Sequence, residues 1–217
     1  MGIEFKQIKK DNSIINSQID AEYESSSVFR DAFSEFMGIT PIKAKHMAKE
    51  LILKAEWINT ILGPMIAISD QEELYLLEFT NKRGLAKEIE KLRKKTAIIP
   101  GNTKPISMIK QELELYFAGK LKVFKTPLHI MGSPFQNKAW NALMKIPYGH
   151  TRSYLEQAKI TGNEKAFRAV ANANGANQLA VVIPCHRIIN NNGDLGGYGG
   201  GIEKKQWLLH HEKQNSK

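Results

Sequence analysis

Cysteine is almost absent from this chain, whose 217 residues contain only Cys185. A single cysteine excludes an intrachain disulfide and any zinc site that needs several thiolates, and it is typical of a reducing compartment. The six histidines show no metal-ligand spacing such as His-Glu-x-x-His. We therefore expect neither a metal nor a small-molecule cofactor.

Long hydrophobic runs are lacking as well. No stretch approaches the ~18 uninterrupted apolar residues that mark a membrane-spanning helix, and residues 2–6 lack the pattern of a signal peptide. The sequence therefore predicts a cytoplasmic protein without a membrane partner, which we expect to be a monomer.

Acidic residues are scarce in the last third of the chain. Residues 131–217 carry 11 basic and 5 acidic side chains, whereas residues 1–50 carry 7 and 8. Such a basic region suits a polyanion, because neutralised phosphates dominate the affinity for nucleic acids. A basic surface that serves only solubility is the alternative.

Cys185 lies in the stretch Ile183-Pro184-Cys185-His186-Arg187. The apolar run Leu179–Ile183 before it predicts a buried strand that ends at Pro184 and presents the thiol. A thiolate is a strong nucleophile, and His186 is the nearest candidate base. Adjacent strand residues point to opposite faces, so the two side chains would need a turn or a bridging water. The alternative is a cysteine that only fills space in the core.

The chain divides into three segments. Residues 1–54 read as short helices, residues 55–130 as an α/β unit without a catalytic cluster, and residues 131–217 as a helical unit with a helix-turn-helix pattern. The expected helices span residues 13–22, 25–37, 42–54, 85–95, 106–117, 134–146, 153–159, 164–173 and 202–213, and the β-like stretches span residues 57–68, 73–80 and 98–99.

Several stretches of the last segment resemble the O6-alkylguanine-DNA alkyltransferases, in register over ~80 residues. The resemblance implies a ribonuclease-H-like domain over residues 55–130 and a winged-helix-like alkyltransferase domain over residues 131–217. It implies direct, irreversible and single-turnover repair of O6-alkylguanine, and possible action on O4-alkylthymine, in double-stranded DNA. The matching stretches are Gly132–Gln136, Ile146–Gly149, Ser153-Tyr154, Arg168–Val170, Asn177 and Pro184–Arg187.

The resemblance also implies roles for individual residues. Cys185 would accept the alkyl group, His186 would activate it through a water, and Glu212 would orient the histidine. Tyr154 would donate a proton to guanine N3 as the base leaves; a phenol is a credible donor.

Other matching residues would bind DNA or the flipped base, by the same resemblance. Arg168 would fill the gap that the rotated nucleotide leaves, with the helix-turn-helix in the minor groove. Asn177 would tie that motif to the active-site turn. The glycine-rich loop with Tyr198 and Gly199, and Lys205 after it, would form the wall of the alkyl pocket, and Ile188 would offer its backbone carbonyl to the guanine amino group.

Residues 24–41 resemble the last helix-turn-helix of AraC-type transcriptional regulators. The chain is thus similar to the Ada family, without that family's cysteine-rich sensor. An alkylation-sensing regulator is therefore an alternative function. A lesion-binding protein without transfer and a cysteine hydrolase are further alternatives, and the presence of Cys185 counts against the first of these two.

Overall fold

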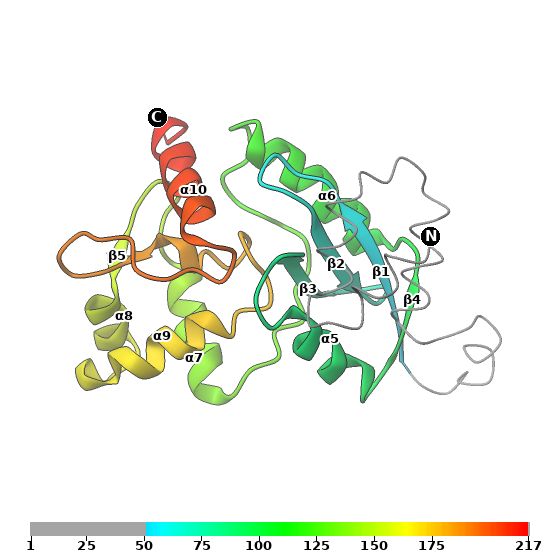
Figure 1. Ribbon diagram of the computed structural model, residues 1–217, viewed down its shortest axis with the longest axis horizontal. Coiled ribbons are helices and arrows are strands. Elements are labelled where there is room, and N and C mark those ends of the chain that lie inside the picture. The colour runs from blue at the N-terminus through cyan, green and yellow to red at the C-terminus, as the bar shows by residue number, and fades with distance from the viewer. Residues whose placement is uncertain (1–50, 217) are drawn as a thin grey trace, which may run out of the picture.

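A four-stranded sheet forms the first unit of the computed structural model, which describes residues 51–216 (Figure 1). The strand order is β3-β2-β1-β4, and only the β1–β4 pair is parallel. Successive residues of β2 enter different cores, because strand side chains alternate between the two faces. The strands are β1 (Ile52–Ile58), β2 (Met65–Ser69), β3 (Leu74–Phe79) and β4 (Ala97–Pro100).

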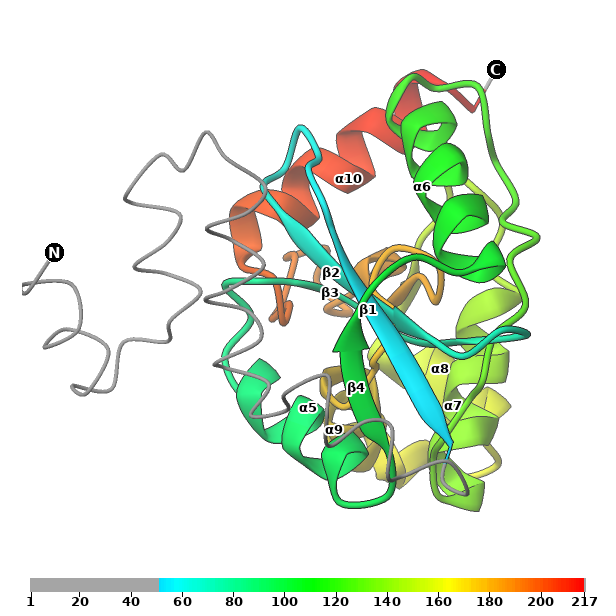
Figure 2. The same ribbon diagram turned by 90° about the vertical axis from the view of Figure 1, so that its right-hand side faces the viewer.

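One helix covers each face of this sheet (Figure 2). Helix α5 (Leu85–Arg93) packs Leu85, Ile89 and Leu92 against one face, and α6 (Lys104–Phe117) packs an apolar stripe against the other. Apolar residues three or four positions apart share a helix face, which explains both contacts.

The second unit is helical. Helices α7, α8 and α9 pack on one another, and two of them begin at capping boxes, those of Ser133 with Gln136 and Ser153 with Glu156. Their bounds, with those of the short elements and of the last helix, are α7 (Pro134–Met144), β5 (Arg152–Ser153), α8 (Tyr154–Ile160), η1 (Glu164–Ala166), α9 (Phe167–Gly175), η2 (Cys185–Arg187), β6 (Ile188–Ile189) and α10 (Ile202–Gln214).

The two units share one hydrophobic core. Phe79 and Tyr116 of the first unit belong to the same buried cluster as Leu143 and Leu208 of the second. Strand β3 is the meeting point, since Leu77 bonds through its backbone to the segment that precedes Cys185. The sheet therefore serves as a rigid support for that segment.

Three sequence-based expectations need correction or lie outside the described residues. The helix predicted for residues 42–54 is wrong at its end, because β1 begins at Ile52; the boundary drawn between residues 54 and 55 therefore cuts a strand. The single β-like stretch 57–68 is two strands, separated by a turn in which Gly63 has φ 102°. The partial AraC-type segment, apart from its last residues, lies outside the described part of the chain.

The helices expected at residues 85–95, 106–117, 134–146, 153–159 and 202–213 are confirmed within a few residues. The expected helix 164–173 is a 3₁₀ turn followed by α9. Among residues 51–216, no helix combines the length and apolar character needed to cross a membrane.

Candidate active site

The segment before Cys185 is a buried turn, so the predicted strand over Leu179–Ile183 is wrong. Leu77 N donates to Gln178 O and Ala180 N donates to Leu77 O, both at 2.8 Å. Val181 has φ 70°, which a regular strand does not allow. The run is apolar because the whole turn is buried against β3, and a short apolar run does not distinguish a strand from such a turn.

Asn177 holds this turn in place. Its Nδ2 donates to Ile183 O at 2.9 Å and to Cys185 Sγ at 3.3 Å, while its Oδ1 accepts from Leu179 N at 3.0 Å. The side chain is buried, so its amide has few competing partners. One asparagine therefore fixes both the turn and the sulfur.

Cys185 begins the 3₁₀ helix η2 and is partly exposed. Burial of its sulfur raises the pKa of the thiol, while the Asn177 hydrogen bond and the charges of Lys82 and Lys205 act in the opposite direction; Glu78 adds to the rise. The raised pKa favours the thiol form, so a nucleophilic thiolate at this position would need a base.

His186 is hydrogen-bonded to the fully buried carboxylate of Glu212. Its Nε2 and Glu212 Oε1 are 2.8 Å apart. Glu212 also accepts from Tyr116 Oη at 2.8 Å and from Arg187 Nε at 2.8 Å. It further accepts from Gly149 N at 3.1 Å. Gly149 has φ 76°, and a Cβ there would lie 2.6 Å from Ser216 Cβ, so this close approach requires glycine.

The charge state of this cluster follows from its partners. Burial alone would raise the pKa of Glu212, but the hydrogen bonds and charges of His186 and Arg187 hold it far below its usual range. Burial lowers the pKa of His186, and Glu212 only partly offsets this. We infer a neutral imidazole that donates its Nε2–H to Glu212. Its Nδ1 is then an acceptor, and that atom has no hydrogen-bond partner among the described residues.

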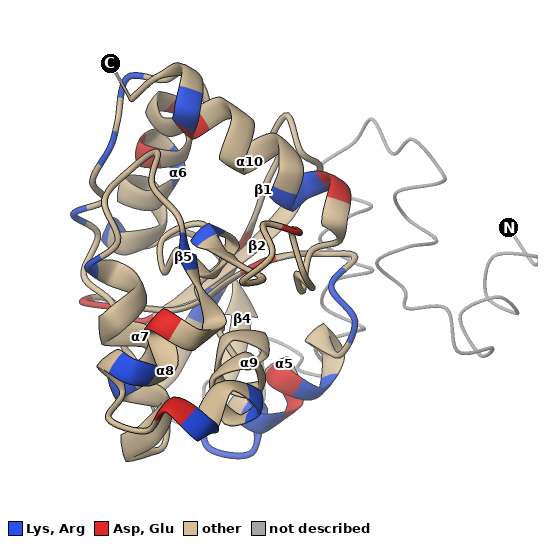
Figure 3. Cartoon of the chain, turned by 90° about the vertical axis from the view of Figure 1, so that its left-hand side faces the viewer, with Lys and Arg blue, Asp and Glu red and all other residues tan. Residues whose placement is uncertain are grey.

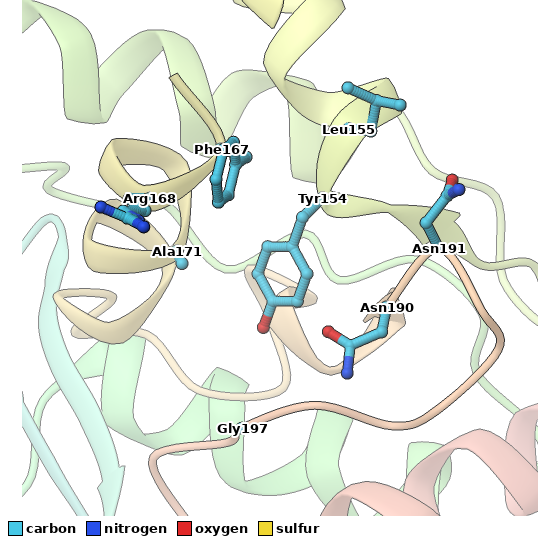
Figure 4. Close-up of a pocket in the computed structure, with 8 residues that line it drawn as sticks. All are labelled: Tyr154, Leu155, Phe167, Arg168, Ala171, Asn190, Asn191 and Gly197. Carbon is cyan, nitrogen blue, oxygen red and sulfur yellow. The ribbon is translucent and has the colours of Figure 1, made fainter. Parts of the chain in front are cut away.

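Tyr154 lines an open pocket of about 530 Å³ next to the turn (Figure 4). Burial raises the pKa of its phenol, and Cys185 adds to the rise. Arg168 and Phe167 of α9 line the opposite wall, and Asn190 lies on the loop below the phenol. Cys185 does not line this pocket; it belongs to the partly buried residues packed against the core beneath it.

Lys205 holds the glycine-rich loop, of which Gly197 lines the pocket. The Lys205 Nζ donates to Ile188 O at 2.5 Å, to Leu195 O, and to Gly197 O at 3.2 Å. Burial lowers its pKa to about 8, and Cys185 raises it in part. The ammonium therefore bonds the backbone of the expected pocket wall, including the Ile188 carbonyl expected to receive guanine.

Tyr198 and Gly199 lie on this loop. Tyr198 packs against the core that includes Cys185, its ring is 6.4 Å from that of His186, and burial raises the pKa of its phenol well above the usual value. Gly199 is exposed, and a Cβ there would lie 3.3 Å from Lys82 Cε. Both residues are near the site, and their contacts with a substrate remain predictions.

Sequence reasoning missed five residues of this region. Arg187 belongs to the matched tetrad Pro184–Arg187, and that membership was a signal that could have found it. Phe167 and Asn190 are neighbours of Arg168 and of the glycine-rich loop. Tyr116 and Lys82 come from the first unit, where no local pattern connects them with Cys185. Within residues 51–216, no group of three His, Cys, Asp or Glu side chains could hold a metal ion.

Comparison with known proteins identifies both units. Residues 134–214 match the family model described as the DNA binding domain of 6-O-methylguanine DNA methyltransferase, and residues 53–130 match its ribonuclease-like domain. A methylated-DNA–protein-cysteine methyltransferase of Methanosarcina acetivorans is 41% identical over 152 residues, covering 68% of this chain and 90% of that protein. The protein of the same name from Mycobacterium bovis is 44% identical over 159 residues, covering 73% of this chain and 92% of that protein.

A solved structure agrees with these matches. The Mycobacterium tuberculosis OGT, crystallised in complex with DNA, is 36% identical and superposes with a TM-score of 0.66, covering 76% of this chain and 94% of that one. Both sequence and fold thus point to one family.

Proposed function

Because the chain belongs to the 6-O-methylguanine DNA methyltransferase family, we propose that it repairs alkylated DNA directly, by moving an alkyl group from guanine O6 to Cys185. The environment of the thiol is the observation that supports Cys185 as the acceptor. Asn177 holds Sγ, and the neighbouring His186 has an acceptor nitrogen free of protein partners in the described part of the chain. Glu212 fixes the imidazole from the other side.

The proposed reaction starts with the thiol proton. His186 Nδ1 takes it, through a water that bridges the two side chains, and the thiolate attacks the alkyl carbon. The sulfur–carbon bond forms as the carbon–O6 bond breaks, and the electron pair of the broken bond stays on the guanine. The Tyr154 hydroxyl gives a proton to the departing base, and the proton held by His186 later restores the phenol. The products are a thioether on Cys185 and an unmodified guanine, so each chain reacts once.

DNA would bind over α8 and α9. Figure 3 shows both basic and acidic positions on α8 and around the start of α9, and residues 152–175 carry four basic side chains against two acidic ones. Such a surface supplies phosphate contacts without reading sequence. The pocket between Tyr154 and Arg168 would admit the flipped nucleotide, whose alkyl group would have to pass the pocket lining to reach Cys185, while the arginine takes the place of the nucleotide in the stack. Unstacking costs a few kcal/mol, which these contacts must offset.

The regulator alternative finds no support. It depended on residues 1–54, whereas the matched family models cover residues 53–130 and 134–214. We further propose that the first unit has a ribonuclease-H-like fold and that the protein is a cytoplasmic monomer.

Mass spectrometry tests the proposal. The full chain is incubated with duplex DNA that contains O6-methylguanine, and intact and peptide masses are measured. We expect a gain of one methyl group per chain, located on Cys185, and no gain in Cys185→Ser. Binding of the lesion without a change of mass would overturn transfer in favour of lesion recognition.

A further inference from the structure

Lys82 is a buried cation between the two units. It lies in the turn that follows β3 and precedes α5, and its side chain is 4% exposed. Burying an ammonium group costs free energy unless its three N–H donors are hydrogen-bonded. The acceptors of these bonds therefore show which segments Lys82 connects.

Three acceptors surround the ammonium. Glu78 Oε1 from β3 lies 2.7 Å from Nζ, Glu88 Oε1 from α5 lies at 3.0 Å, and the main-chain carbonyl of Asn177 lies at 2.7 Å. The first two come from the same unit as Lys82, and the third comes from the segment that leads to the thiol. Lys82 therefore joins the sheet to the active-site turn.

A single residue, Asn177, connects this junction to the sulfur of Cys185. The carbonyl of Asn177 accepts from Lys82, while the amide of the same residue donates to Ile183 O and Cys185 Sγ. The stem of Lys82 also lies against the glycine-rich loop, since a Cβ at Gly199 would be 3.3 Å from its Cε. One side chain thus contacts two segments that surround the proposed site.

The charges of this cluster reach the thiol. Lys82 lowers the pKa of Cys185 and Glu78 raises it, so the two partly cancel. Glu88 faces Lys82 and Lys91, and Tyr198 and the ammonium of Lys205 also interact electrostatically with the thiol. Removing Lys82 would take away a charge that lowers the pKa of the thiol, and it would also raise the pKa of Glu78, which the ammonium holds down.

We propose that Lys82 is a positioning residue for alkyl transfer, which holds the Asn177 turn and thereby fixes Cys185 against the incoming alkyl carbon. The proposal rests on the function proposed above. It gives the first unit a part in the chemistry, although that unit supplies no group that touches the substrate.

The test compares Lys82→Met, which keeps the stem and removes the charge, with Lys87→Met, an exposed lysine of α5. Three quantities are measured: methyl transfer at saturating lesion-containing duplex, the Kd for that duplex, and the pH dependence of Cys185 alkylation by iodoacetamide. The last measurement needs neither DNA nor methyl transfer.

For Lys82→Met we expect transfer to slow by at least about tenfold, since small misplacements of reacting groups have large effects on rate. The Kd should stay near that of the wild type, because the basic surface of α8 and α9 is unchanged. The midpoint of the iodoacetamide profile should move to higher pH. Lys87→Met should behave as the wild type in all three measurements.

Lys82→Gln is the second variant, because its amide can still donate to the Asn177 carbonyl. It keeps the test possible if Lys82→Met does not fold. Its transfer should be slower than that of the wild type but faster than that of Lys82→Met, because the bond to Asn177 is kept while the ion pairs are lost, and the pH midpoint should move in the same direction. A folded variant of either kind with wild-type transfer and an unchanged pH midpoint would overturn the proposal. Failure of the proposed function would instead show as absence of transfer in the wild type.

Discussion

Replacement of Glu212 by glutamine should remove the most densely bonded acceptor of the site. Its Oε1 accepts from His186, Tyr116 and Arg187 Nη2, and its Oε2 accepts from Arg187 Nε and Gly149 N. In Glu212→Gln an NH₂ group replaces one oxygen and faces donors only. Two of the five bonds are lost if the amide oxygen takes the place of Oε1, and three if it takes the place of Oε2.

The magnitude follows from these counts. A hydrogen bond to a charged group contributes about 1.5–3 kcal/mol, so two lost bonds amount to about 3–6 kcal/mol. Arg187 also loses its buried counter-charge, a change that typically costs about 3–5 kcal/mol. The two estimates describe the same lost interactions and are not added, so we expect the free energy of unfolding to fall by about 3–5 kcal/mol. For a domain of this size that lowers Tm by roughly 6–20 °C.

Thermal unfolding followed by circular dichroism checks this expectation, with Glu203→Gln, an exposed position on the same helix, as the control. The control should stay within about 0.5 kcal/mol of the wild type. The pKa of Glu212 is lower in the folded than in the unfolded chain, so its contribution is present above the unfolded value and is lost as pH falls toward the folded one. The difference between wild type and Glu212→Gln should therefore shrink below about pH 4. A Tm at pH 7 within about 2 °C of the wild type would refute the reasoning.

Two further predictions concern other parts of the molecule. Phe167 is 48% exposed beside Arg168, and Phe167→Ala should weaken duplex binding by about fivefold or more, because a stacking aromatic contributes about 1–3 kcal/mol. Ile202→Ala, at 47% exposure on α10, is the control in a fluorescence titration, and equal affinities for the two variants would exclude stacking. Burial raises the pKa of Glu78 to about 7, although the charge of Lys82 acts in the opposite direction. Between about pH 5 and 8 the folded chain therefore binds a proton at Glu78 that the unfolded chain has lost, so the free energy of unfolding falls as pH rises through this range. Glu78→Gln should lose less stability than the wild type over that range in urea unfolding, and parallel pH profiles would contradict the assignment.

The helices of the described chain could be predicted because their signals are local. Pro134 at the start of α7, the capping residue Ser153 and the apolar stripe of α6 each lie within one or two turns of the element they define. The strands were harder. The predicted stretch 57–68 ran through a turn, because apolar residues lie on both sides of Gly63-Pro64 and this dipeptide, itself a turn signal, was not read as a break.

The candidate site divides in the same way. Cys185, His186 and Asn177 lie close together in the sequence, so a motif could bring them to attention. Tyr116 and Lys82 could not be found in this manner, because they reach Glu212 and Asn177 only through the packing of β3 and α6 against the second unit. Their roles depend on contacts between residues about 95 positions apart, for which a single sequence carries no local signal.

The electrostatics of Cys185 suit a protein that reacts once. Burial raises the pKa of the thiol, and it lowers the pKa of the His186 imidazole that would take the proton in the proposed reaction. Proton transfer between the two is therefore unfavourable at rest, and stray electrophiles meet a weakly nucleophilic thiol. A fast reaction with the lesion must then come from placing the alkyl carbon in line with a sulfur that is already fixed. The hydrogen bonds of Asn177 to the turn and of Glu212 to the imidazole supply that order before any substrate arrives.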